Sequence, residues 1–124
     1  MMKPTYEVDA VQAFPKDAKG YHMLSNGKRI KIGTNVRFGK NVSLGGGCVI
    51  GNNTEIRENT TIQEFSWVGN NCIIGSECVI GADTTICEYC HLGNDVTVGD
   101  HAFIEHSLTI GDGRRINHFE RVDW

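Results

Sequence analysis

The sequence predicts an all-β chain whose short strands wind into the stacked coils of a prism. An aliphatic residue, once phenylalanine, returns every six residues at fifteen consecutive positions from 32 to 116, without an insertion. Glycine follows it in ten of the first fourteen units, and the fifth position of each unit is mostly small. Six is neither the helical period of 3.6 nor the strand period of 2. A sustained repeat of this kind is typical of a solenoid.

One unit explains the pattern. In Cys72-Ile73-Ile74 the first and third side chains point to one side of an extended chain and the middle one to the other. The unit is therefore a short strand with a small and an aliphatic residue facing inward. Segments such as Gly93-Asn94-Asp95 follow, and glycine and asparagine tolerate the positive φ of sharp corners.

The elements follow in chain order. Residues 1–31 lack the repeat, and Asn26-Gly27 between short apolar runs predicts a hairpin turn, so this segment is expected to cap the first coil. Residues 32–115 are the expected repeat domain. Arg114 breaks the column of small residues, so we expect regular packing to end near residue 112. Residues 116–124 are the second expected cap, in which Phe119, Val122 and Trp124 would cover the last coil.

Composition narrows the function classes. The chain has 124 residues, 15 glycines, two prolines and a net charge of −3, which favours one domain and argues against nucleic acid or an anionic membrane as a partner. We expect no signal peptide and no membrane span, because no apolar run is long enough. Five cysteines at scattered spacings are expected to be reduced thiols in a cytoplasmic protein. Cys72 and Cys90 would fill the core, whereas Cys87 replaces a corner glycine and is expected to be exposed and reactive.

The units IGNNTE, VGNNCI, IGSECV, IGADTT and LGNDVT resemble the hexapeptide repeat of the left-handed parallel β-helix family. The resemblance covers residues 32–115. It implies a triangular prism in which three units make one 18-residue coil, with about four to five coils between short N- and C-terminal caps. It also implies a homo-oligomer, with a trimer of parallel prisms favoured.

If a coil has 18 residues, side chains 18 apart stack on one face, and one such face carries a row of aromatic residues. We expect this row to be a subunit interface; a ligand platform and unconnected exposed side chains are the alternatives. The predicted interface residues are Val49, Phe65, Trp67, Thr85 and Phe103, with His101 at a corner beside them.

Glu88 and His106 share one predicted corner column, one coil apart. A carboxylate that orients a histidine and stabilises its charged form is what a general base requires. An ordinary surface ion pair on a turn is the alternative interpretation.

Many hexapeptide-repeat proteins are acyltransferases, and the resemblance implies acyl-CoA as the cosubstrate. A histidine there deprotonates a sugar hydroxyl or an amine, which attacks the thioester in a cleft between two prisms. His106 or His101 would be the catalytic base, with Glu88 orienting His106. The repeat has no inserted loop and the cap is short, so the subunit interface would have to form the acceptor site.

Two alternatives remain open. His101 and His106 are five residues apart, as in γ-class carbonic anhydrases, but Phe65 and Asn70 occupy the positions two coils upstream where a third histidine is needed. His91 would complete a zinc site only if the corner geometry allowed it, and we expect no metal. The other alternative is a non-catalytic structural, binding or assembly module, which would need no cofactor.

Overall fold

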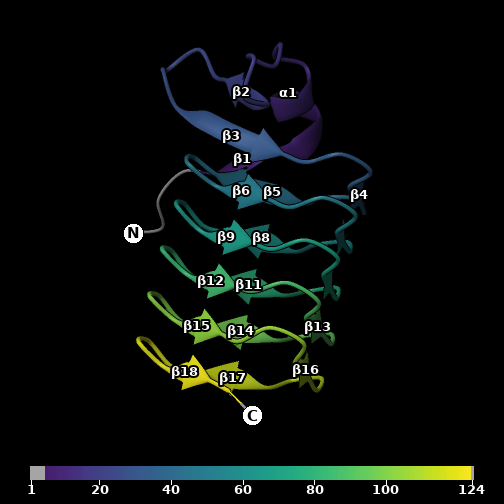
Figure 1. The fold of residues 1–124 in the computed structure, drawn as a ribbon, viewed down its shortest axis with the longest axis vertical. Coiled ribbons are helices and arrows are strands. Elements are labelled where there is room, and N and C mark those ends of the chain that lie inside the picture. The colour runs from purple at the N-terminus through teal and green to yellow at the C-terminus, as the bar shows by residue number, and fades with distance from the viewer. Residues whose placement is uncertain (1–4, 124) are drawn as a thin grey trace.

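The computed structural model describes residues 5–123 and shows a left-handed parallel β-helix of about five coils, as the family resemblance implied (Figure 1). The coils stack from the N-terminal cap, drawn in purple, to the yellow C-terminal end. The chain forms one short helix, α1 (Val8–Gln12), and many short strands. The strands are β1 (Thr5–Glu7), β2 (Tyr21–Met23), β3 (Arg29–Ile32), β4 (Arg37–Phe38), β5 (Ser43–Gly45), β6 (Val49–Ile50), β7 (Glu55–Ile56), β8 (Thr61–Ile62), β9 (Trp67–Val68), β10 (Ile73–Ile74), β11 (Val79–Ile80), β12 (Thr85–Ile86), β13 (His91–Leu92), β14 (Thr97–Val98), β15 (Phe103–Ile104), β16 (Thr109–Ile110), β17 (Arg115–Ile116) and β18 (Arg121–Val122).

Parallel strands pair one coil apart, so the coil length is 18 residues. Ile73, for example, pairs with Glu55 on one side and with His91 on the other. The three sides of the prism are three sheets, ordered β1-β5-β8-β11-β14-β17, β4-β7-β10-β13-β16 and β2-β3-β6-β9-β12-β15-β18. The columns of stacked residues that the resemblance implied are therefore present.

The core consists of the aliphatic column and of the small residues at the fifth positions. The small residues do more than fill space, because they satisfy backbone groups at the corners. Thr60 donates its hydroxyl to the carbonyl of Gly75 at 2.7 Å and accepts from the N–H of Cys78 at 3.2 Å. Cys72 likewise donates its thiol to the carbonyl of Cys87, 15 residues further on. The core thus carries its own ladder of side-chain hydrogen bonds.

Each corner contains a residue in the left-handed region of φ. Asparagine fills several of these positions, for example Asn53 and Asn71, both with φ of 58°. Asparagine is one of the few L-residues that adopts this conformation readily, which explains the recurring Gly-x-Asn. Phe65, Tyr89 and Phe119 occupy equivalent corners with φ near 60°, where bulky residues are rare.

The repeat continues beyond the predicted limit, so the expectation that regular packing ends near residue 112 is wrong. β17 pairs with β14, and β18 pairs with β15, each in the 18-residue register. Arg114 occupies the fifth position of a repeat unit in the last coil, where its side chain is exposed and is therefore tolerated. Its guanidinium lies 3.8 Å from the carboxylate of Glu120. Residues 116–122, assigned to a separate cap, therefore belong to the last coil, and Trp124 lies outside the described residues.

The N-terminal segment covers the first coil with pieces of different kinds. β1 pairs antiparallel with β5, and β2 pairs antiparallel with β3 around the turn that contains Asn26 and Gly27. α1 packs onto the open core between them with Val8 and Val11 buried. Two of the three sheets gain an extra strand in this way, while the sheet that begins with β4 does not.

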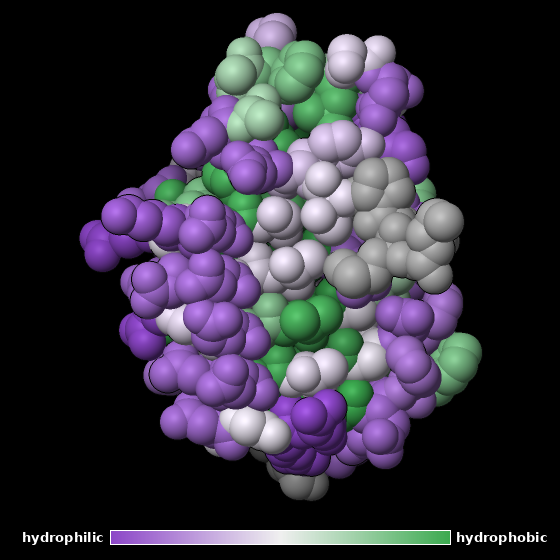
Figure 2. All heavy atoms as spheres, turned by 180° about the vertical axis from the view of Figure 1, so that it is seen from behind, coloured by the Kyte–Doolittle hydropathy of each residue, from purple (hydrophilic) through white to green (hydrophobic). Residues whose placement is uncertain are grey.

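The side of the prism that Figure 1 hides has a pale to green centre between two polar edges (Figure 2). The sheet that contains β8 and β11 has weakly polar or apolar outward residues in its middle, such as Thr61 and Val79, and ends at Arg115. Among residues 5–123, the outward positions of the parallel strands of this sheet carry no aromatic side chain.

Candidate functional site

The predicted aromatic row is present on the sheet that contains β6, β9, β12 and β15. We call the outward side chains of β6, β9, β12 and β15 the aromatic face; they are Val49, Trp67, Thr85 and Phe103, in register. Trp67 is 56% exposed. Phe103 is partly covered by Arg121, whose guanidinium lies 5.1 Å from the ring centroid and also pairs with Glu105. The uncovered apolar surface is therefore concentrated around Trp67.

Phe65 extends this surface around the neighbouring corner. Its side chain is 57% exposed, and its φ is 59°. The ring packs over Gly47 so closely that a Cβ there would lie 2.5 Å from a ring carbon. A bulky L-residue in this region costs about 1–2 kcal/mol of backbone strain, and such strain often marks a functional position.

His101 lies at the same corner as Phe65, two coils further on. Its ring stacks on Phe119 with centroids 5.0 Å apart and an interplanar angle of 3°. Its Nε2 lies 3.9 Å from a carboxylate oxygen of Asp83. This histidine is thus held by neighbours along its own corner and does not line a described hollow beside the aromatic face.

His106 and Glu88 lie at the other edge of the aromatic face and line one hollow, which we call the Trp67 hollow. Its volume is about 360 Å³. The lining residues are Gly51, Trp67, Gly69, Asn70, Thr85, Ile86, Cys87, Glu88 and His106. Gly51 and Gly69 carry no side chains beside the indole, which leaves the space open. The structure therefore brings together two of the three predicted catalytic residues and separates them from His101 by the length of β15.

The corner column that carries Glu88 and His106 also contains asparagines that join neighbouring coils by hydrogen bonds. The N–H of Thr34 donates to Oδ1 of Asn52, and the N–H of Asn52 donates to Oδ1 of Asn70, both at 2.8 Å. The next two positions of this column are Glu88 and His106 instead of asparagine. The series Asn52, Asn70, Glu88, His106 was visible in the sequence at intervals of 18, but the change of residue type along it was not recognised.

A histidine at a corner is not by itself a sign of chemistry, as His118 shows. At another corner Nδ1 of His118 accepts the N–H of Asp100 at 2.7 Å, the ladder role that Asn70 has elsewhere. Nδ1 of His106 lies 3.3 Å from the hydroxyl of Ser107, and His106 lines the Trp67 hollow together with Glu88.

The cysteines are free thiols. The hydrogen bond to Cys90, together with burial, raises the pKa of Cys72, and burial raises the pKa of Cys48 to about 11. Cys87 is only half-buried and lines the Trp67 hollow, but burial and the charge of Glu105 raise its pKa as well. At neutral pH it is a protonated thiol, so the expectation that Cys87 is reactive is not supported.

The zinc alternative finds no support in the geometry. Within residues 5–123 there is no group of three or more histidine, cysteine or acidic side chains that could hold a metal ion. His91 lies on a different sheet from β15, and His22 is buried in the cap, where Nδ1 donates to the carbonyl of Phe14 at 2.6 Å. The three histidines needed for zinc do not converge.

A larger hollow, of about 400 Å³, lies at the N-terminal end, and no histidine or cysteine lines it. The residues with catalytic potential therefore surround the smaller hollow. No helix among residues 5–123 has the length and apolar character needed to cross a membrane.

The prism and its corner pattern define a hexapeptide-type β-helix domain. The family model "GMPPB C-terminal domain" matches residues 24–122, most of the chain, and the chain belongs to this family. Among solved structures it is similar to a hexapeptide transferase family protein from Anaplasma phagocytophilum, with 16% identity, 77% of this chain and 74% of that chain covered, and a TM-score of 0.29. No curated protein matches the chain.

Proposed function

We propose that the chain is an assembly module whose aromatic face packs against further copies of itself, in a trimer of parallel prisms. The observation that carries this proposal is the exposure of Trp67 in the middle of a flat, in-register column, with Phe65 beside it. Large aromatic side chains at the centre of a flat surface are typical anchors of protein interfaces. The strained corner conformation of Phe65 also fits a residue that is retained for a contact outside its own chain.

A second feature supports the proposal. The same face ends in the ion pair of Arg121 with Glu105, which gives an apolar patch a polar border, as interfaces commonly have. The free thiols fit a reducing compartment, and we infer a cytoplasmic location.

The test is the mass of the protein in solution, measured by light scattering after size exclusion. We expect three times the chain mass of 13.7 kDa for the wild-type protein, and the mass of a single chain for Trp67→Glu, which would place a charge in the interface. Val79→Glu is the matched control, because Val79 is also an exposed, outward strand residue but lies on another sheet. A wild-type protein that is monomeric at micromolar concentration would refute the proposal.

Acyl transfer from acyl-CoA is a second candidate, and a specific observation favours it. The corner column changes from asparagine to Glu88 and His106, and both line the Trp67 hollow. In this reaction His106 takes the proton from an acceptor hydroxyl or amine, and Glu88 orients the imidazole and stabilises its charged form. The acceptor oxygen or nitrogen then attacks the thioester carbonyl. Collapse of the tetrahedral intermediate breaks the carbon–sulfur bond and releases CoA, whose sulfur receives the proton from His106.

Calorimetric titration with acetyl-CoA after zinc removal tests this candidate separately from assembly. We expect saturable binding that weakens in His106→Ala. His91→Ala is the matched control, because this exposed histidine lies on another sheet. His101→Ala distinguishes the two predicted bases, and an effect larger than that of His106→Ala would assign the site to the other corner. Absence of binding at millimolar acetyl-CoA, with the oligomer intact, would overturn acyl transfer while leaving the assembly proposal standing.

A further inference from the structure

The three sheets of the prism begin differently at the N-terminal end. The sheet with β5 is extended by β1, and the sheet with β3 is extended by β2. The third sheet begins at β4, which pairs with β7 on one side. Within residues 5–123, no strand pairs with the opposite side of β4, whereas β1 and β2 fill the equivalent positions on the other two sheets. One of the three sides of the cap is therefore incomplete.

Backbone hydrogen bonds show the same difference. The carbonyls of Val42 and Cys48 point toward the cap and accept the N–H groups of Val8 at 3.1 Å and Lys31 at 2.9 Å. The equivalent carbonyl on the third side belongs to Val36, and no backbone N–H within residues 5–123 donates to it. Arg37 and Gly39 donate their N–H groups to the coil that contains β7. Because the backbone groups of successive strand residues point to opposite sides, the N–H and carbonyl of Phe38 point away from β7 and toward the cap. These groups form the free edge of a sheet.

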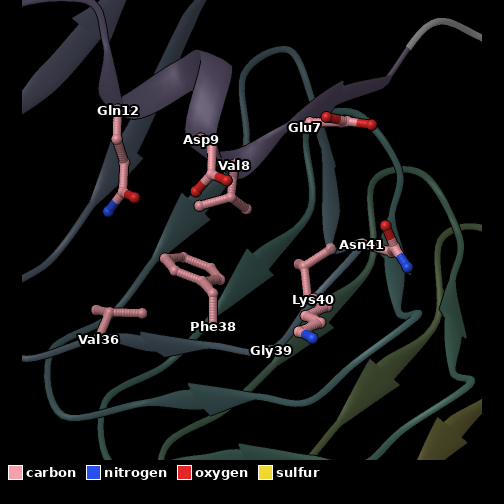
Figure 3. Close-up of a pocket in the computed structure, with 10 residues that line it drawn as sticks. Glu7, Val8, Asp9, Gln12, Val36, Phe38, Gly39, Lys40 and Asn41 are labelled. Carbon is pink, nitrogen blue, oxygen red and sulfur yellow. The ribbon is translucent and has the colours of Figure 1, made fainter.

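A hollow lies along this edge (Figure 3). Its volume is about 400 Å³, and it lies between α1 and the segment 36–42. Val36 and Phe38 point into it from the first coil, and both are only half-buried although they occupy core positions of the repeat. Asp9 and Gln12 point into it from α1. The hollow is thus the place of a missing strand whose apolar side chains would cover Val36 and Phe38.

The shape and charge of the hollow limit what can fill it. α1 lies beside the hollow (Figure 3), and a single extended chain, which needs roughly 4.8 Å from its paired neighbour, fits along the free edge of β4. Glu7 and Asp9 give this border two carboxylates against the single amine of Lys40. The border therefore complements a segment with basic residues.

We propose that this hollow binds an extended peptide segment of a partner protein, which adds a strand to the free edge of β4. Alternate apolar side chains of the segment contact Val36 and Phe38, and its basic residues pair with Asp9 and Glu7. Backbone pairing supplies affinity, and the apolar and acidic subsites supply selectivity, as in other cases of strand addition. This surface is separate from the aromatic face and from the Trp67 hollow.

The test is an NMR titration of the ¹⁵N-labelled full chain with the peptide acetyl-Lys-Val-Thr-Val-Lys-amide, which alternates apolar and polar side chains. We expect saturable shifts in the millimolar range, centred on the amide of Phe38 and on α1. Asp9→Lys should weaken binding by about tenfold, because an attraction becomes a repulsion. Asp123→Lys at the far end of the prism is the matched control and should bind as the wild type does.

Two control peptides separate the contributions. Proline in place of the central threonine removes a backbone donor and should abolish binding. Glutamate in place of both lysines should weaken it as Asp9→Lys does. The proposal is overturned if no saturable shift occurs, if the proline peptide binds equally well, or if the shifts centre on another edge such as β18. It is also overturned if Asp9→Lys dissociates an oligomer of the chain, because the hollow would then be an interface between copies.

Discussion

Replacement of Thr60 by valine tests whether the hydroxyl ladder of the core stabilises the fold. Thr60 is fully buried, and its hydroxyl is the hydrogen-bond partner of both the carbonyl of Gly75 and the N–H of Cys78. Valine has nearly the same shape, so the substitution removes the hydroxyl without opening a cavity. Two buried backbone groups are then left unpaired.

The magnitude follows from these contacts. Each unpaired buried group costs about 1–3 kcal/mol, and the additional buried methyl group offsets about 1 kcal/mol. We therefore expect Thr60→Val to lower the free energy of unfolding by about 2 kcal/mol, which corresponds to a melting temperature about 8 °C lower for a chain of this size. Urea unfolding followed by far-UV circular dichroism measures the change.

Two variants control for other effects. Thr60→Ser keeps the hydroxyl and loses one methyl group, so its cost should be only about 1 kcal/mol. Thr61→Val changes the next residue, which points outward, and should alter stability by less than about 0.5 kcal/mol. The reasoning fails if Thr60→Val is at least as stable as Thr60→Ser, since the small residues would then merely fill space.

Four further predictions concern the corners and the thiols. Tyr89→Asn should raise the unfolding free energy by up to about 1 kcal/mol, because φ of 62° strains tyrosine but suits asparagine; a lower melting temperature would contradict this. Gly51→Ala should cost about 2 kcal/mol in urea unfolding, since its Cβ would lie 2.5 Å from the carbonyl carbon of Gly69; an unchanged midpoint would show that the coils can separate. The rate at which iodoacetamide alkylates Cys87 should rise about tenfold per pH unit to beyond pH 9, because its pKa is raised, and a plateau at pH 7 would contradict the raised value. The free energy of unfolding should be constant to about pH 8 and fall toward pH 11, because thiols ionise in the unfolded chain while Cys48 in the folded chain, with a pKa of about 11, stays protonated. A smaller fall in Cys48→Ala would confirm the cause, and an equal fall would exclude it.

The fold could be predicted because each residue of the repeat has a fixed geometric role. A run such as Cys72-Ile73-Ile74 specifies which side chains face the core, and the 18-residue coil, which the family resemblance implied, then specifies which residues pair. The same reasoning failed at Arg114, because it treated all coils as equivalent. A fifth-position side chain in the last coil has no coil beyond it, so a charged residue is accommodated at the open end. The hydrogen bonds of the fifth-position hydroxyls and thiols were also missed, since size alone was considered.

The candidate site could be predicted only in part. The neighbourhood of Glu88 and His106 followed from their separation of 18, but the hollow beside them depends on the position of Trp67 over two glycines. The sequence made His101 an equal candidate for the catalytic base. Its stacking on Phe119 could not be predicted, because Phe119 is a corner residue in a segment that was expected to be a cap. A catalytic role depends on how deep a hollow is and on where the side chains around it point, and a periodic sequence does not encode either property.

The repeat itself indicates where function is encoded in this chain. Core packing constrains the residues at inward positions, and a positive φ constrains the residues at corner positions. A residue at either position therefore fits the repeat or strains it. Phe65 is strained and exposed, and Glu88 and His106 stand where asparagine stands earlier in the same corner column. At the N-terminal end, the side with β4 lacks the strand that its two neighbours have. Because Trp67 belongs to the aromatic face and also lines the Trp67 hollow, Trp67→Glu should impair both assembly and acetyl-CoA binding, whereas His106→Ala should weaken acetyl-CoA binding alone and Asp9→Lys peptide binding alone. If instead one variant impaired all three, the surfaces would belong to a single interface, and the assembly would be the functional unit.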